Sequence, residues 1–341
     1  MSQLLIRSAA LLNWHSVLAR KHPPSADVDN AINSITRMLS INDSHLRLSE
    51  YVSTLERLDP GQAQGLAWEV GTSAKLEDDS QISKALLGCE TLGAALSWGC
   101  KFFPLQQDGT SLQLEQDDQW AMLCYKIQDP QIWPRHIDAV CNLGFQARFI
   151  KAAAPEAWSQ VQLIVESESN TNSANLAKIT QASVIHGGST NAIRFPASLL
   201  DAPFAPQNDY DPTAISDLSK TLTAKERTTP ISQRTRKLIF SQLNEGNVSQ
   251  CRIAKSLGLS SRTLRRKLSD EGQSFRELLD LCRMQSAGLE LRKQQKVSLS
   301  EIAIRLGYTE HSTFSRAFTR WAGIPPREFR LAHTGVAHRD S

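Results

Sequence analysis

The sequence lacks the features that direct a protein to a membrane or to secretion. No apolar run approaches the roughly 20 residues that a membrane-spanning helix requires. Near the start of the chain, Arg7 interrupts the apolar residues and no basic segment precedes them, so the arrangement of a signal peptide is missing. We therefore expect a cytoplasmic protein that has no membrane partner.

Cysteine is scarce and scattered. The six cysteines are Cys89, Cys100, Cys124, Cys141, Cys251 and Cys282, and none belongs to a C-x-x-C motif. This spacing favours reduced thiols over a disulfide framework. The eight histidines form no H-x-x-x-H motif and no Cys/His cluster with zinc spacing. We expect no metal site and no cofactor.

Motifs of covalent catalysis are also missing, since neither G-x-S-x-G nor S-x-x-K occurs. The segment G-C-E-T-L-G-A-A-L superficially resembles a nucleophile elbow, with Cys89 as the thiol. No histidine or acid can be assigned as its partner, and a cysteine beside an apolar helix usually serves packing. We predict no catalytic residue and no enzymatic activity.

Charge, in contrast, is plentiful and unevenly distributed. Residues 232–332 contain 19 Lys/Arg against 9 Asp/Glu, whereas residues 1–231 contain 18 against 25. The net charge of +3 therefore conceals a basic C-terminal third and an acidic remainder. A basic domain neutralises phosphates and releases counterions, which is typical of DNA binding. The alternative is a solvated basic surface without a partner.

Residues 298–329 carry the signals of a helix-turn-helix motif in the right order. Ser298 and Glu301 form a capping box, and Gly307 supplies the left-handed residue that ends the first helix. We interpret Thr309 as the N-cap of the next helix. The apolar side of that helix comprises Phe314, Phe318 and Trp321. Its polar side remains available for a partner.

A second copy of the motif lies upstream at residues 249–268. The segment Ile253–Gly258 repeats the pattern of Ile302–Gly307 at a constant offset of 49 residues. Between the copies, residues 274–293 predict one amphipathic helix, roughly 30 Å long at 1.5 Å per residue. Because one DNA turn measures about 34 Å, the two units could enter successive major grooves.

These motifs resemble the AraC/XylS family of bacterial transcription regulators. The matching segments are S-x-R-x-L-x-R at Ser260–Arg266, G-Y-x-x-x-S-x-F-S-R-A-F at Gly307–Phe318 and W-x-G-x-x-P-x-x-F-R at Trp321–Arg330. Over residues 232–333 the resemblance implies an all-α DNA-binding domain in which a linking helix joins two helix-turn-helix units. It places the recognition helices near 260–269 and 310–321. The DNA-contacting residues that it implies are Arg262, Arg265, Arg266, Lys267, His311, Ser312, Ser315 and Arg316.

The N-terminal part predicts an α+β domain. We expect helices at 3–20, 28–39, 45–58, 91–103 and 135–153, and strands at 111–115, 119–127, 161–165 and 192–195. Over about 60–210, the segments L-G-x-A-L (Leu92–Leu96), N-A-I-R-F-P (Asn191–Pro196) and L-L-D-A-P-F (Leu199–Phe204) resemble the arabinose-binding-like sensor domain of AraC-type regulators. This resemblance implies a small-molecule effector of unknown identity.

Aromatic side chains are the candidates for lining an effector pocket. They are Trp68, Trp98, Phe102, Trp120, Tyr125, Trp133, Phe145 and Phe149. Arg135 or Arg148 is available for a carboxylate. Packing in the domain core explains these residues equally well.

The chain is thus expected to contain a ligand-sensing and dimerisation domain (1–210), a linker (211–231), the DNA-binding domain (232–333) and a tail (334–341). The predicted function is a sequence-specific, ligand-responsive transcriptional activator that binds promoter DNA as a homodimer and contacts RNA polymerase. One alternative is a repressor or architectural protein whose front domain only dimerises. Another is an enzyme fused to a DNA-binding domain.

Overall fold

The protein is described from a computed structural model. The structure describes residues 4–7, 9–20, 33, 35–37, 45–58, 60–73, 80–167, 173–204, 211, 213–243, 248–293 and 297–334. The chain forms two compact units, one of residues 1–127 and 134–225 and the other of residues 128–133 and 226–341. Within the described ranges, no helix is long and apolar enough to cross a membrane.

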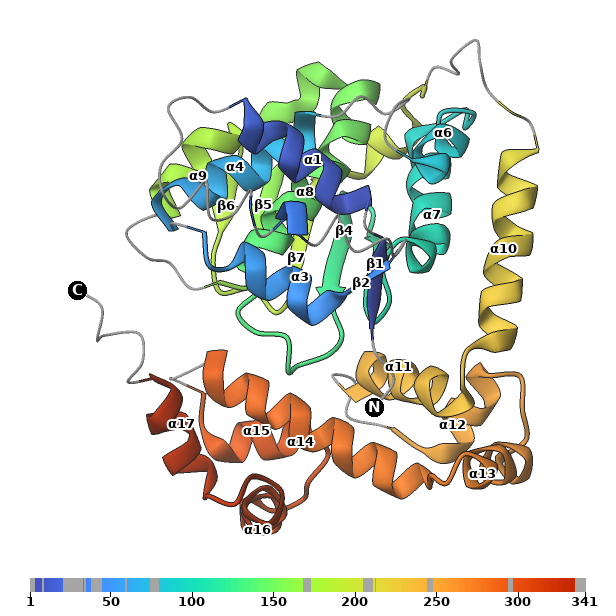
Figure 1. Ribbon diagram of the computed structural model, residues 1–341, viewed down its shortest axis with the longest axis vertical. Helices are drawn as coiled ribbons and strands as arrows, with labels where there is room; N and C mark the ends of the chain where they lie inside the picture. Colours follow the sequence, from blue (N-terminus) through green and yellow to red (C-terminus); the bar gives the residue numbers. More distant parts are fainter. Residues whose placement is uncertain are drawn as a thin grey trace. The chain divides into compact units, whose positions relative to one another are not determined.

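The first unit is built on a five-stranded sheet in the order β3-β4-β7-β5-β6 (Figure 1). Its strands are β3 (Thr110–Gln116), β4 (Trp120–Ile127), β5 (Gln162–Ile164), β6 (Ser183–Ile185) and β7 (Asn191–Pro196). All neighbouring pairs are antiparallel except β5 and β6. The predicted β3–β4 hairpin is confirmed. Asp117 closes its turn, because its carboxylate accepts hydrogen bonds from the backbone N–H groups of Gln119 (2.8 Å) and Trp120 (2.7 Å).

Helices pack on and around this sheet. They are α1 (Ala9–Ala19), α3 (Leu48–Leu55), α4 (Pro60–Ser73), α6 (Gln81–Leu86), α7 (Leu92–Phe102), α8 (His136–Ala153) and α9 (Ser173–Thr180), with 3-10 turns at Phe103–Leu105, Pro155–Gln160 and Ala197–Asp201. Helix α10 (Ala214–Thr228) follows in the chain and includes the boundary between the two units at residue 225. Helix α8 contacts both the sheet and α4. The two helices cross at Gly71 and Gly144, where a Cβ on Gly71 would lie 2.2 Å from the carbonyl oxygen of Cys141. Glycine is therefore required for so close a crossing.

Charged and polar groups are buried beneath α8. The side chain of Arg135 is 2% exposed and donates to both carboxylate oxygens of Glu166, at 2.9 and 3.0 Å. The Tyr125 hydroxyl donates to the carboxylate of Asp138 at 2.6 Å. Burial raises the pKa of Asp138 to about 6. Burial likewise raises the pKa of Glu56, whose carboxylate accepts the backbone N–H of Ile137 at 2.6 Å, to about 7.

The N-terminal segments differ from the helices expected at 3–20 and 45–58. Leu5–Arg7 forms strand β1 and His45–Arg47 forms strand β2, and the two pair antiparallel before helices α1 and α3 begin. These strands are only three residues long, so their alternation is too brief to outweigh the helical pattern that follows. Most of the helix expected at 28–39 lies outside the described residues.

The second unit is all-α. It contains α11 (Ile231–Leu243), α12 (Gln250–Ser256), α13 (Ser261–Asp270), α14 (Phe275–Lys293), α15 (Leu299–Arg305), α16 (His311–Ala322) and α17 (Pro326–Thr334). The fold class expected from the sequence, α+β followed by an all-α domain, is confirmed. Of the expected tail, residues 335–341 lie outside the described part of the chain.

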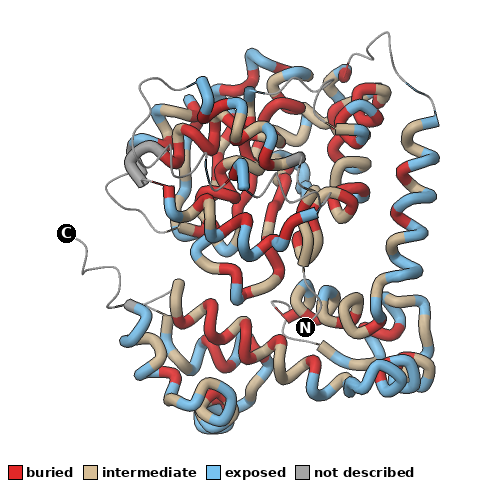
Figure 2. The backbone as a smooth tube through the Cα atoms, viewed as in Figure 1, coloured by how far each residue is buried: buried red, intermediate tan, exposed pale blue. Residues whose placement is uncertain are grey.

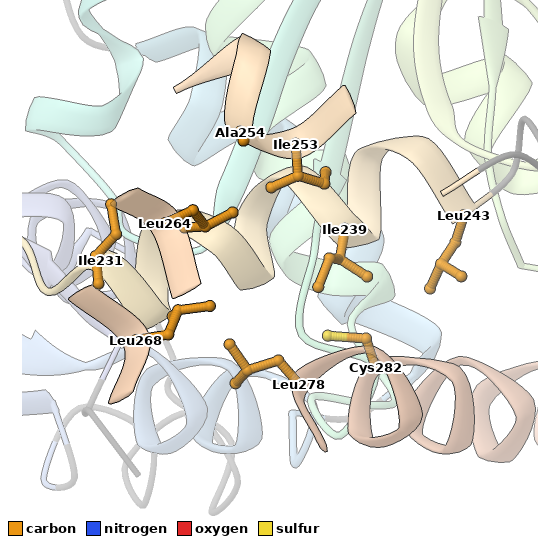
Figure 3. Packing of buried hydrophobic residues seen from close by; sticks show 9 residues of the cluster. All are labelled: Ile231, Ile239, Leu243, Ile253, Ala254, Leu264, Leu268, Leu278 and Cys282. Carbon is orange, nitrogen blue, oxygen red and sulfur yellow. The ribbon is translucent and has the colours of Figure 1, made fainter. Parts of the chain in front are cut away.

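Two hydrophobic cores lie along this unit, and α14 contributes to both. The first contains Ile231, Ile239, Leu243, Ile253, Ala254, Leu264, Leu268, Leu278 and Cys282 (Figure 3). The second contains Met284, Ala287, Leu291, Ile302, Ala303, Leu306, Phe314 and Phe318. Buried positions follow the length of α14, whereas α13 is mostly exposed (Figure 2). The predicted linking helix is therefore a shared structural element.

Candidate nucleic-acid interface

Helix α13 is held by its two leucines and presents its other side to solvent. Its N-cap is Ser260, whose hydroxyl accepts the backbone N–H of Thr263 at 3.1 Å. Leu264 and Leu268 are fully buried in the first core. This spacing of four residues turns the remaining positions of the helix outward.

The outward positions of α13 are strongly basic. Arg262, Arg265, Arg266 and Lys267 are all exposed. None of them forms an ion pair with a residue in the described ranges. By contrast, Arg305 on α15 is paired with Glu301 at 2.6 Å. The four charges of α13 are thus available to an external anion.

The turns that precede the two recognition helices have the same geometry. Gly258 (φ +69°) and Gly307 (φ +79°) occupy the left-handed region as predicted. The residue after each glycine donates its N–H back across the turn, Leu259 to the carbonyl of Ala254 and Tyr308 to that of Ala303, both at 2.9 Å. This bonding satisfies helix-terminal carbonyls and ends the helix. The repeat seen in the sequence is therefore also a repeat in structure.

Helix α16 presents a less basic surface than α13. Its N-cap is Glu310 rather than the expected Thr309, and the cap makes no side-chain hydrogen bond. His311 and Ser315 contact each other at 3.2 Å, and the Ser312 hydroxyl donates to Glu310 at 3.1 Å. Among the predicted contact residues of α16, Arg316 alone carries a full positive charge. It is exposed and forms no ion pair with any residue the structure describes.

Trp321 is less buried than an inward position implies. Phe314 and Phe318 are fully buried, but Trp321 remains 41% exposed although its ring packs on that of Phe318 at 5.6 Å. Ala322, the last residue of α16, packs against the second core, so Trp321 lies at the edge of that core and not inside it. The predicted apolar stripe is therefore correct for two of its three residues.

Two family models match the two units separately. The model described as a helix-turn-helix domain matches residues 253–332, and that described as the arabinose-binding domain of AraC transcription regulator, N-term, matches residues 61–204. The chain belongs to the AraC family of transcriptional regulators. As an AraC-family member it is a DNA-binding transcriptional regulator with an arabinose-binding-like sensor domain.

Several regulators are similar to this AraC-family chain. The uncharacterized HTH-type transcriptional regulator Rv1395 of Mycobacterium tuberculosis is 27% identical over 276 residues, which is 78% of each chain. VirS of the same species is 38% identical over 109 residues, 32% of each chain. VqsM of Pseudomonas aeruginosa is 39% identical over 77 residues, 23% of each chain. The crystal structure of the transcriptional regulator CdpR from Pseudomonas aeruginosa aligns over 94% of this chain and 96% of its own, with 22% identity and a TM-score of 0.39.

The residues that the sequence offered for chemistry in the first unit have structural roles instead. Burial raises the pKa of the Cys89 thiol, which is the opposite of an activated nucleophile. Arg135 is occupied by Glu166, and the guanidinium of Arg148 lies 4.1 Å from the ring centre of Phe145. The first unit contains a cavity whose wall includes residues of β1, α1 and α8, and neither arginine lines it.

Two of the eight candidate aromatic residues, Phe145 and Phe149, do line that cavity. Sequence reasoning missed the polar residues beside them, among them Arg7, Gln107 and Gln146. No motif marks these side chains, because the cavity gathers residues far apart in the chain.

Proposed function

We propose that the protein is a sequence-specific, ligand-responsive transcriptional activator that inserts α13 and α16 into successive major grooves. The observation that carries this proposal is the exposed basic side of α13, free of intramolecular ion pairs within the described structure. Arg262, Arg265 and Arg266 contact base edges or the adjacent phosphates, and arginine can bond guanine O6 and N7 in bidentate fashion. Lys267 contacts phosphate.

In this proposal, the second helix-turn-helix motif, which contains α16, discriminates less among DNA sequences than the first. The residues that it offers are His311, Ser312, Ser315 and Arg316, and the first three already form hydrogen bonds with neighbouring side chains. Helix α14 has 19 residues and is therefore about 28 Å long. This length suits two recognition helices placed about one DNA turn, 34 Å, apart.

The remaining parts of the proposal follow from the family. The sensor domain (1–210) binds an effector and dimerises, the linker (211–231) joins it to the DNA-binding domain (232–333), and RNA polymerase is contacted at the promoter. The protein acts in the cytoplasm, uses no cofactor and is not an enzyme.

Footprinting on a promoter fragment tests the proposed DNA binding. We expect two protected major-groove segments about one turn apart for each protomer. A single protected segment would show that only one of the two helix-turn-helix units binds DNA. A repressor or architectural protein with a purely dimerising front domain would give a footprint and a promoter output that no added metabolite alters.

A further inference from the structure

A cavity of about 220 Å³ lies inside the first unit. Helix α8 supplies much of its wall, and other lining residues come from β1, α1, α3, α4, α6, α7 and β3. The α8 residues are Cys141, Asn142, Phe145, Gln146 and Phe149. A space of this size and mixed lining suits a small organic molecule.

Most polar groups of the lining are already occupied. The amide of Gln107 donates to the Tyr125 hydroxyl at 2.9 Å, and that of Asn142 donates to the carbonyl of Asp138 at 3.1 Å. Gln146 differs, because it is 4% exposed and its amide makes no hydrogen bond with any residue that the structure describes. An amide in the cavity wall can both donate to and accept from a ligand, so this group is suited to bind one.

The charge of the lining has one sign. Arg7 is its single charged residue, and the lining includes no Asp, Glu, Lys or His. Strand β1 fixes the backbone of Arg7, whose N–H donates to the carbonyl of Gln106 at 3.0 Å. Its guanidinium has no ion-pair or hydrogen-bond partner in the described parts of the chain. Such a lining attracts one negative charge and disfavours a cation.

Apolar side chains make up a further part of the wall. Phe103, Phe145 and Phe149 contribute aromatic rings, and Ile82, Leu86 and Leu112 contribute aliphatic side chains. These groups can bury the body of a ligand whose charged end lies at Arg7.

We propose that this cavity is the effector site and that the effector is a small organic monocarboxylate with an apolar body. The carboxylate pairs with Arg7, the apolar body lies against Phe145 and Phe149, and Gln146 bonds the carboxylate or a second polar group. This inference rests on the proposed ligand response and specifies the chemistry of its ligand.

Thermal unfolding of the full chain without DNA tests the ligand class. The probes are phenylacetate and hexanoate, their uncharged amides phenylacetamide and hexanamide, and the cation phenethylamine. At about ten times the dissociation constant, a carboxylate should raise the unfolding temperature by about 3 °C. The matching amide should give a smaller shift and phenethylamine none. Equal shifts for acid and amide, or no shift with either carboxylate, would overturn the proposal.

Variants locate the binding. Arg7→Gln should abolish the difference between each carboxylate and its amide, whereas Arg20→Gln, an exposed arginine of the same unit outside the cavity lining, should preserve it. Ala10→Phe fills the cavity from α1 and should remove the shifts with both carboxylates and amides. Circular dichroism checks that each variant is folded. A carboxylate preference that survives Arg7→Gln would place the anion site elsewhere.

The test of the ligand class can fail or succeed independently of the proposed function. The unfolding measurements contain no DNA, so a failed footprint leaves them unaffected. Conversely, a bipartite footprint that responds to a metabolite other than a carboxylate would support the proposed function and overturn the assigned ligand class.

Discussion

Basic side chains on α13 of the second unit are exposed, whereas two carboxyl groups of the first unit are buried. On α13, the spacing of Leu264 and Leu268 leaves four basic side chains in water and free to meet phosphate or base edges. In the first unit, the carboxyls of Asp138 and Glu56 lie where burial disfavours their charged forms. At the scale of the residue, the first arrangement is the one that we propose for DNA binding, and the second makes stability depend on pH.

Arg265→Ala should relax the preference for particular base pairs. A lost bidentate contact reduces discrimination between specific and random DNA by about 1–3 kcal/mol. Fluorescence anisotropy at one fixed salt concentration measures both affinities. Arg276→Ala removes an exposed arginine of α14 and should leave the discrimination unchanged. Equal weakening on specific and random DNA would contradict base contact by Arg265.

Glu56→Gln should stabilise the first unit at pH 8 and have little effect at pH 5. Burial raises the pKa of Glu56 from its usual 4.5 to about 7 in the folded protein. Between pH 4.5 and pH 7, the folded state therefore binds more protons at this carboxyl than the unfolded state does. Stability from this group is therefore lost as pH rises through that window. Glutamine avoids the buried charge and still accepts the N–H of Ile137.

The expected gain is about 1–3 kcal/mol at pH 8, measured by urea unfolding at both pH values. Glu90→Gln, at an exposed glutamate, should change stability little at either pH. An equal effect of Glu56→Gln at pH 5 and pH 8 would mean that the substitution acts through packing or hydrogen bonding.

At the scale of the element, helices α4 and α8 of the first unit cross at a short distance. Gly71 and Gly144 meet there, and the neighbouring residues Cys141 and Phe145 line the cavity. The backbone contact therefore positions part of the cavity wall. A side chain at the crossing would alter fold and cavity together.

Gly71→Ala should destabilise the first unit by about 1–3 kcal/mol, the usual cost of overpacking. The reason is the 2.2 Å approach of the new Cβ to the Cys141 carbonyl oxygen. Gly65→Ala, on the same helix, is the matched control, since its Cβ would lie 3.5 Å from Ile179 in ordinary contact. It should be neutral or slightly stabilising. Chemical denaturation compares the two variants, and equal stabilities would show that the helices can separate without cost.

Elements with strong local signals could be predicted from the sequence. Ser298 caps its helix as expected, the two glycine turns have the expected left-handed backbone, and α14 follows the expected amphipathic span. The short strands β1 and β2 could not be predicted, because they form only by pairing between residues about 40 positions apart in the sequence. The cavity was missed for the same reason. Its amide side chains come from separate elements and lie close together only in the folded protein.

At the scale of the whole molecule, the uneven charge distribution separates two tasks. The basic domain favours DNA, whereas the acidic remainder disfavours nonspecific contact with phosphate. The family match to both units shows that these tasks belong to one regulator. The modest total charge therefore underestimates the electrostatic part of DNA affinity.

Affinity for DNA should fall steeply with salt, in proportion to the number of phosphates neutralised. Each lost phosphate contact reduces the slope of log K against log salt by about 0.9. Lys267→Ala should show such a reduction on random DNA, measured by anisotropy across a salt series. Lys178→Ala, at an exposed lysine of α9 in the first unit, should leave the slope unchanged. An unaltered slope for Lys267→Ala would exclude its phosphate contact.

The shared helix α14 also restricts how this DNA-binding domain can change in length. Since each added residue turns a helix by about 100° and advances it by 1.5 Å, a single insertion between Cys282 and Met284 would rotate the second core relative to the first. The two recognition helices would then lose their common rotational phase along the duplex. Two whole turns, about seven residues, would restore the phase but add roughly 10 Å to their separation. In the proposed binding mode, the number of residues in this one helix thus sets the distance between the two half-sites of the operator.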